Sequence, residues 1–159
     1  MSGQSKDITV VLDYSLPGTI DEVYQYLANP VNDEEWQSSC DKVTLKNPDM
    51  PIQKGTEYII HFAFLSRKMN FEAQVSEYDK NKHYAYETLS GPLRYQGHYT
   101  FVPTESEVKI HWVFTATPGK FFGIIPHNLI RKTLIKRVSE DVERLKERFA
   151  SWQRVKKAS

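Results

Sequence analysis

The chain has 159 residues, of which 40% are hydrophobic and 26% charged, the composition of an ordinary globular protein with one domain. Its formal net charge of +1 gives no overall drive toward nucleic acid, and its single cysteine, Cys40, excludes an internal disulfide. No stretch approaches the ~18 apolar residues of a membrane span. We therefore expect a cytoplasmic protein with one domain over residues 1–159, disordered at 1–6 and frayed at 153–159.

The first elements predicted are a strand and two short helices. Residues 8–15, "ITVVLDYS", alternate as a strand does. Thr19 and Glu22 then form a T-x-x-E capping box, which marks the start of a helix that Asn29-Pro30 ends. Asn32 can cap a second turn, which would deliver Trp36 to whatever lies beneath. We expect this pair of helices to close one end of a groove.

The middle of the chain has the period of two that is typical of strands. Segments 54–64, 69–78, 93–102 and 107–117 each place aromatic or aliphatic residues on one face and polar residues on the other. With residues 8–15 and the shorter runs "DKVTLKN" and "HYAYETL", the pattern predicts about seven strands. Short turns join them, so the sheet is expected to be antiparallel, with one packed face.

A long amphipathic helix is predicted from about residue 126 to 152. Its apolar positions recur every three or four residues, and it would extend roughly 40 Å, long enough to cross the whole sheet. The expected fold class is therefore α+β: a curved antiparallel sheet of about seven strands wrapped around a long C-terminal helix, with two short helices after the first strand.

One segment resembles a known superfamily. "LPGTIDEVYQYLANPVNDEEWQSS" is similar to the "aP-x-E-x-V-[WF]-x-x-[LIV]-[AS]-[DN]-P-x-x-x-x-x-W" segment of the START-like (SRPBCC) superfamily, and most similar to its polyketide cyclase/dehydrase and lipid-transport families. Gly55 at the start of a strand, "SGPLRYQGHYTFVP" and "DVERLKERF" support the resemblance. It implies a helix-grip fold with a cavity between the sheet and the long helix.

The residues that alternation places on the packed face of the sheet, most of them aromatic, are the candidates for lining such a cavity. The predicted ligand-binding residues are Trp36, Tyr58, Phe62, Phe71, Tyr95, Tyr99, Trp112, Phe114, Phe122, Ile125, Leu129 and Ile130. The alternative is that these side chains fill the interior as an ordinary core. Gly97, in mid-strand on the inward face, either makes room for something or bends the sheet.

Few polar residues suggest chemistry. His127, at the start of the long helix, could reach a ligand or be an exposed first-turn residue. Glu87 and Arg94 could form an ion pair across a hairpin, or one of them could contact a ligand headgroup. His61, His98 and His111 have the polar parity of their strands, and no His-x-His or Cys-x-x-Cys spacing is present, so no metal site, cofactor or catalytic residue is predicted.

The C-terminal segment is basic, with ten lysines and arginines against four acidic residues from His127 onward. This helix could make transient contact with an anionic membrane surface. The alternative is an ordinary solvated face, on which Lys136/Glu140, Arg137/Asp141 and Glu140/Arg144 pair at i, i+4. Nucleic acid is not an expected partner, because the aromatic residues point inward.

Three functions follow as hypotheses. The first is binding of a small hydrophobic molecule, such as a lipid, isoprenoid or polyketide-like compound. The second is a cyclase/dehydratase-type enzyme that uses the same cavity, and the third is a protein-interaction module similar to chaperone activators. The sequence favours the first over an enzyme, since it offers no paired acid and base, and it leaves the oligomeric state open.

Overall fold

The described residues form a seven-stranded antiparallel sheet with one long helix and three short ones. The computed structural model describes residues 7–118, 123 and 125–158. The strands are β1 (Ile8–Pro17), β2 (Cys40–Leu45), β3 (Glu57–Phe64), β4 (Arg67–Asp79), β5 (His83–Ser90), β6 (Arg94–Pro103) and β7 (Glu107–Thr117). The helices are α1 (Ile20–Leu27), the 3₁₀ turn η1 (Pro30–Asn32), α2 (Asp33–Trp36) and α3 (His127–Ala158).

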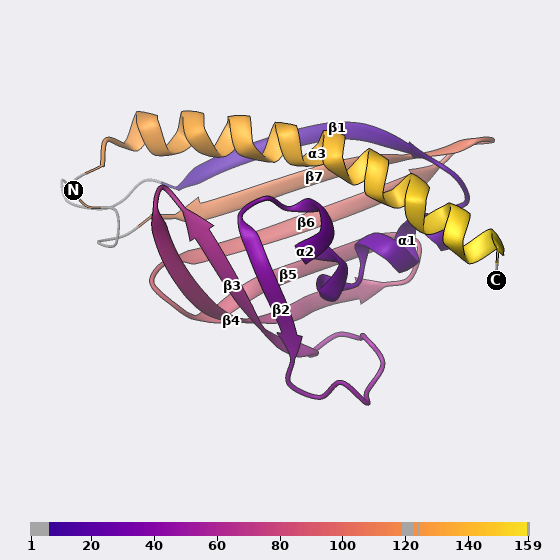
Figure 1. Ribbon diagram of the computed structural model, residues 1–159, viewed down its shortest axis with the longest axis horizontal. Helices are drawn as coiled ribbons and strands as arrows, with labels where there is room; N and C mark the ends of the chain where they lie inside the picture. Colours follow the sequence, from indigo (N-terminus) through magenta and orange to yellow (C-terminus); the bar gives the residue numbers. More distant parts are fainter. Residues whose placement is uncertain (1–6, 119–122, 124, 159) are drawn as a thin grey trace.

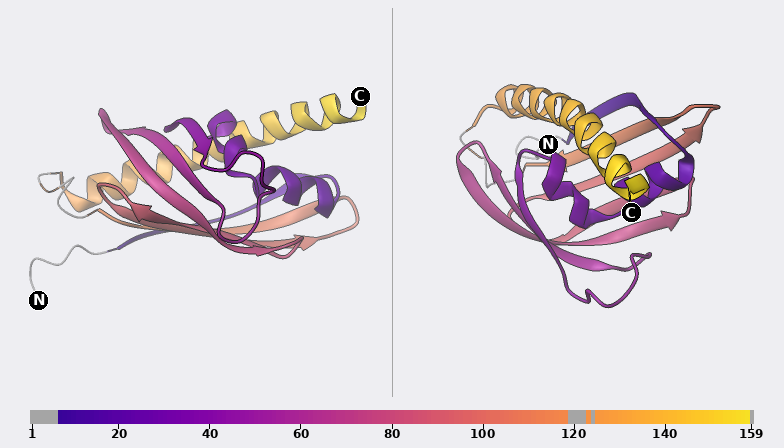
Figure 2. Two further views of the ribbon diagram at one scale, coloured as in Figure 1. Left: turned by 90° about the horizontal axis from the view of Figure 1, so that it is seen from below. Right: turned by 45° about the vertical axis from the view of Figure 1, so that its right-hand side comes forward.

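The strand order in the sheet is β1-β7-β6-β5-β4-β3-β2, and every neighbouring pair is antiparallel. The sheet curves around α3, and α1 and α2 lie on the same side of it as α3 (Figures 1 and 2). This α+β helix-grip arrangement, with short helices directly after the first strand, confirms the expected fold class.

The short helices form where the sequence places them, with one difference. The Thr19–Glu22 capping box is present: the Glu22 backbone N–H donates to Thr19 Oγ1 at 3.2 Å, and the Thr19 N–H donates to Glu22 Oε1 at 3.2 Å. The expectation that Asn32 caps α2 is wrong, because its side chain makes no capping bond and instead donates to the carbonyl of Tyr26 at 2.9 Å.

The inward face of the sheet is almost entirely aromatic or aliphatic, as the alternation predicts. On this face Gly97 lies opposite Tyr86, and a Cβ at position 97 would collide with the Tyr86 ring. Gly97 therefore makes room for a tyrosine side chain.

The long helix α3 buries Ile130, Val138, Val142, Leu145 and Phe149 against the sheet and the short helices. It continues to Ala158 and so includes residues 153–158, and the fraying expected at this end stays a prediction. Asp141 is only 4% exposed, so the interpretation of Arg137 and Asp141 as a pair on a solvated face is wrong.

Candidate functional site: a cavity between the sheet and the long helix

A cavity lies between the inward face of the sheet and the N-terminal half of α3. The centre of a water-sized sphere can occupy about 100 Å³ of this cavity. By the same measure one water molecule needs only about 10–15 Å³. The interior is therefore not filled completely at this end. Most of its lining is apolar: Tyr58, Ile60, Phe62, Phe64, Met69, Phe71, Tyr86, Leu93, Tyr95, Trp112, Phe114, Ala116, Pro118, Ile130, Leu134 and Val138.

Most of the predicted ligand-binding residues line this cavity. They are Tyr58, Phe62, Phe71, Tyr95, Trp112, Phe114 and Ile130. Trp36 and Tyr99 are buried but do not line it, because both pack on Trp112. The Trp36 ring meets Trp112 edge-on at 5.9 Å between centroids, and Tyr99 stacks on it at 5.3 Å.

The remaining apolar candidates lie outside the lining. Leu129 is 50% exposed, and Ile125 is partly buried at the edge of the core. Phe122 lies outside the described residues.

The three polar candidates are not among the cavity residues either. Glu87 accepts a hydrogen bond from Gln74 Nε2 at 2.7 Å, and His127 is the half-buried first residue of α3. Arg94 is exposed and pairs in register with Thr117, while Glu87 pairs with Gln96. The hairpin thus keeps Glu87 and Arg94 out of register, and no ion pair joins these two described residues.

The polar part of the lining comes from elsewhere. Asp33 and Gln37 belong to α2 and its C-cap, Ser39 follows, and Arg137 and Asp141 project from α3. Two hydrogen bonds tie these segments together: Arg137 Nη1 donates to Ser39 Oγ at 3.2 Å, and the Ser38 N–H donates to Asp141 Oδ1 at 3.0 Å. The guanidinium of Arg137 also lies 5.8 Å from the centre of the Phe64 ring.

Asp33 is the most unusual of these groups. Its side chain is buried, and within the described part of the chain its carboxyl makes no hydrogen bond. Burial raises the pKa of the Asp33 carboxyl well above its ordinary value, because the charged form loses its hydration. A carboxyl that holds its proton can both donate and accept a hydrogen bond, so Asp33 offers an unused polar contact beside the apolar cavity.

The tyrosines of the lining stay neutral for the same reason. Burial, followed by the neighbouring tyrosines and Asp33, raises the pKa of Tyr58 and Tyr95 well above the ordinary value. Burial likewise raises the pKa of Tyr86, with a smaller contribution from the neighbouring Asp33 carboxyl. Each hydroxyl is thus available as a neutral donor or acceptor, and the wall formed by the sheet carries no charge.

Sequence reasoning missed Asp33, Arg137, Asp141 and Tyr86, although signals for some of them exist. Asp33 precedes Trp36 by three residues, so one turn of helix places both on the same face. Arg137 and Asp141 flank the apolar stripe of α3 at Val138 and Val142, where a partly buried polar residue is compatible with the pattern.

Comparison with known proteins places this architecture in a family. The model of the polyketide cyclase / dehydrase and lipid transport family matches residues 7–150. The chain belongs to this family. No curated protein sequence matches it. No helix in the described segments is long and apolar enough to cross a lipid bilayer.

Solved structures share the fold at low sequence identity. A START superfamily protein from Mycobacterium smegmatis superimposes with a TM-score of 0.74 at 9% identity, over 91% of this chain and 98% of that one. A protein from Thermus thermophilus gives 0.73 at 16% identity, over 90% and 97%. The Zhui aromatase/cyclase from Streptomyces sp. R1128 gives 0.64 at 15% identity, over 91% and 92%. These likenesses show the START-like fold.

Proposed function

We propose that the protein binds a compact hydrophobic molecule, such as a lipid, isoprenoid or polyketide-like compound, in the cavity between the sheet and α3. The observation that carries this proposal is an aromatic-walled space of about 100 Å³ beside one buried carboxyl that has no hydrogen-bond partner among the described residues. Apolar cavities with a few directional polar groups are the usual form of a small-molecule site. Family membership and the likeness to an aromatase/cyclase support the same class of ligand.

The polar lining defines what the ligand should carry. Asp33 borders the cavity and its carboxyl has no hydrogen-bond partner among the described residues, so a ligand oxygen can bond it without displacing another contact. Because burial raises the pKa of that carboxyl and disfavours its charged form, it suits a carbonyl or hydroxyl oxygen better than a cation. The apolar body of the ligand would lie against Trp112 and Phe114.

A cyclase/dehydratase-type enzyme is the second candidate, and Asp33 is again the observation that favours it. A protonated carboxyl beside a bound carbonyl can act as a general acid. Asp33→Asn distinguishes the two functions, because an amide still donates a hydrogen bond but cannot transfer a proton. A carrier would retain its ligand in this variant, whereas an enzyme would lose turnover.

The first test is native mass spectrometry of the gently purified protein, followed by organic extraction. We expect one hydrophobic molecule per chain. The fluorescent probe 1-anilinonaphthalene-8-sulfonate should bind the emptied protein and be displaced by the extracted compound.

A matched pair of variants locates the binding. Leu134→Trp places an indole into the cavity from α3, whereas Leu129→Trp adds the same group to the same helix at a half-exposed position outside the lining. We expect Leu134→Trp to lose both the co-purifying molecule and the probe, and Leu129→Trp to keep them. Equal binding by both variants, or a protein that stays empty with lipids, quinones and aromatic polyketides, would overturn the proposal.

Contact of the basic end of α3 with an anionic membrane surface stays a prediction of the sequence. Lys156 donates to Gln25 at 2.6 Å and lies 4.8 Å from the centre of the Trp152 ring. Sedimentation with vesicles that contain phosphatidylserine tests the contact, and binding that does not weaken as salt rises would contradict an electrostatic mechanism.

A further inference from the structure

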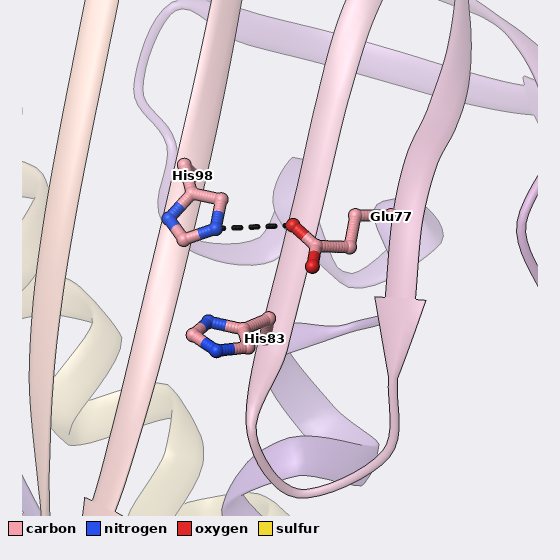
Figure 3. A group of neighbouring side chains, drawn as sticks. All are labelled: Glu77, His83 and His98. Atoms are coloured by element: carbon pink, nitrogen blue, oxygen red, sulfur yellow. Dashed lines mark hydrogen bonds and ion pairs between the residues drawn. The ribbon is translucent and has the colours of Figure 1, made fainter.

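The outer face of the sheet holds a cluster of side chains independent of the cavity. Glu77 on β4, His83 on β5 and His98 on β6 come from three adjacent strands and point toward one another (Figure 3). One potential ligand atom from each residue lies within 4.8 Å of the other two. We propose that these three residues bind a divalent transition-metal ion, with Zn²⁺ as the representative case.

An irregularity of the sheet places Glu77 in this cluster. Val75 faces inward and pairs with Tyr86, so strict alternation would also turn residue 77 inward. The register shifts between Val75 and Glu77, and Glu77 pairs with Ala85 instead. A bulge of this kind re-aims the side chains that follow it, and here it moves a carboxylate to the outer face.

Strand register then brings the two histidines to the same place. Ala85 pairs with Glu77 on one side and with His98 on the other, and its small side chain leaves space for them to meet above it. His83 lies two residues before Ala85 and therefore on the same face of β5. Its carbonyl accepts a hydrogen bond from the Tyr24 hydroxyl at 2.8 Å, which ties this end of β5 to α1.

The distances are close to those of a metal site. Glu77 Oε1 and His98 Nε2 are 3.1 Å apart. Ligand atoms at about 2.0–2.1 Å from a tetrahedral Zn²⁺ lie roughly 3.3 Å from one another, so this edge already has the required length. The ligand atom of His83 lies within 4.8 Å of the other two, so the His83 ring must move closer to them when a metal ion binds.

An unsatisfied atom also points to a missing ligand. His83 Nδ1 is buried and has no hydrogen-bond partner among the described residues. Buried ring nitrogens are normally bonded to a donor, an acceptor or a metal, because leaving one unpaired destabilises the fold. The Glu77–His98 hydrogen bond satisfies only two of the three residues in the cluster.

The donor set selects the class of metal. Two imidazoles and one carboxylate suit Zn²⁺, Co²⁺, Ni²⁺ and Cu²⁺, whereas Mg²⁺ and Ca²⁺ prefer oxygen ligands only. The side chains of Glu77 and His98 are 44% and 41% exposed, so water can occupy a fourth position. Sequence spacing could not reveal this set, because its members lie on separate strands.

The experiment is a titration of metal-stripped protein with Zn²⁺ against a chromophoric chelator, at about pH 7.5, where most imidazoles are neutral. We expect one ion per chain, and a loss of affinity of about tenfold or more in His98→Ala and in His83→Ala. Glu77→Gln keeps the shape of the side chain and should weaken binding as well. Zn²⁺ should raise the unfolding temperature of the wild type but not of His98→Ala.

His111→Ala is the matched control. His111 Nδ1 lies 2.6 Å from Asp13 Oδ1, a second histidine–carboxylate pair at exposed positions, but no third ligand joins it among the described residues. Its removal should leave Zn²⁺ affinity unchanged. The proposal fails if the wild type binds no Zn²⁺, if binding survives in both His83→Ala and His98→Ala, or if Mg²⁺ competes equally.

Discussion

The two halves of α3 carry the same apolar pattern but meet different surroundings. In the C-terminal half, Leu145 and Phe149 are almost completely buried, and the rings of Tyr26 and Trp152 lie 5.5 and 5.7 Å from that of Phe149. In the N-terminal half, Ile130, Leu134 and Val138 border the cavity. The difference comes from the facing elements, since α1 supplies Tyr26 to one half, whereas α2 is a single turn that adds Asp33 to the other. An amphipathic stripe therefore does not distinguish a core from a ligand site.

The largest effect on stability is expected in the C-terminal half of α3. Leu145→Ala should destabilise the protein by about 3–5 kcal/mol, because Leu145 is fully buried and its truncation leaves a cavity. Chemical denaturation measures the change. Binding of the naphthalene probe to the folded fraction should remain normal, and a loss of binding there would mean that the two halves are coupled.

Gly97→Ala tests whether the sheet wall beside the cavity is as tightly packed as the C-terminal half of α3. The new methyl group would collide with the Tyr86 ring, and overpacking of this kind destabilises by about 1–3 kcal/mol. Because Tyr86 lines the cavity, its displacement should also weaken probe binding. The double variant Gly97→Ala/Tyr86→Leu should recover stability, and a failure to recover would instead assign to Gly97 a role in bending the strand.

Leu134→Ala is the counterpart of Leu145→Ala in the N-terminal half of α3, which borders the cavity. We expect a loss of about 2 kcal/mol or less, because part of the Leu134 side chain already faces open space. The affinity for the probe should change more than the stability does. If the two leucine variants are equally destabilised, the cavity is filled in solution and the contrast between the halves is lost.

The smallest change between neighbouring conditions, about 1.4 kcal/mol for each pH unit, concerns the pH dependence introduced by Asp33. Its pKa is raised by burial, so between the unfolded and folded pKa values the folded chain holds a proton that the unfolded chain has released. Stability is therefore greatest below the unfolded pKa of about 4 and falls as pH rises, by about 1.4 kcal/mol for each pH unit until the folded pKa is reached.

Asp33→Asn should remove this slope. Urea denaturation of the variant and the wild type across the acid to neutral range measures it. Asp141, whose pKa burial also raises, contributes in the same direction in both proteins and cancels in the comparison. Identical slopes in the two proteins would show that the Asp33 carboxyl is hydrated, and would remove it as a polar contact for the ligand.

The sequence predicted the fold and much of the cavity, but not its polar groups. Tyr58, Phe71 and Trp112 were accessible to prediction because alternation along a strand assigns a face to each residue. Trp36 and Tyr99 were correctly predicted to point inward, but both pack on Trp112 and do not line the cavity. The direction of a side chain does not tell how far it lies from the cavity. Asp33 and Asp141 were missed because acidic residues are ordinarily on the surface.

The amino-acid sequence was sufficient for the local features and for the family: the capping box of α1, the seven alternating strands and the amphipathic stripe of α3. These depend on residues a few positions apart, which a single segment contains. The packing of distant segments was needed to show which half of α3 borders the cavity, that Asp33 lies buried beside it, and that Glu77, His83 and His98 meet. Those features depend on sheet curvature, on a bulge in β4 and on strand register, which arise when distant segments pack together.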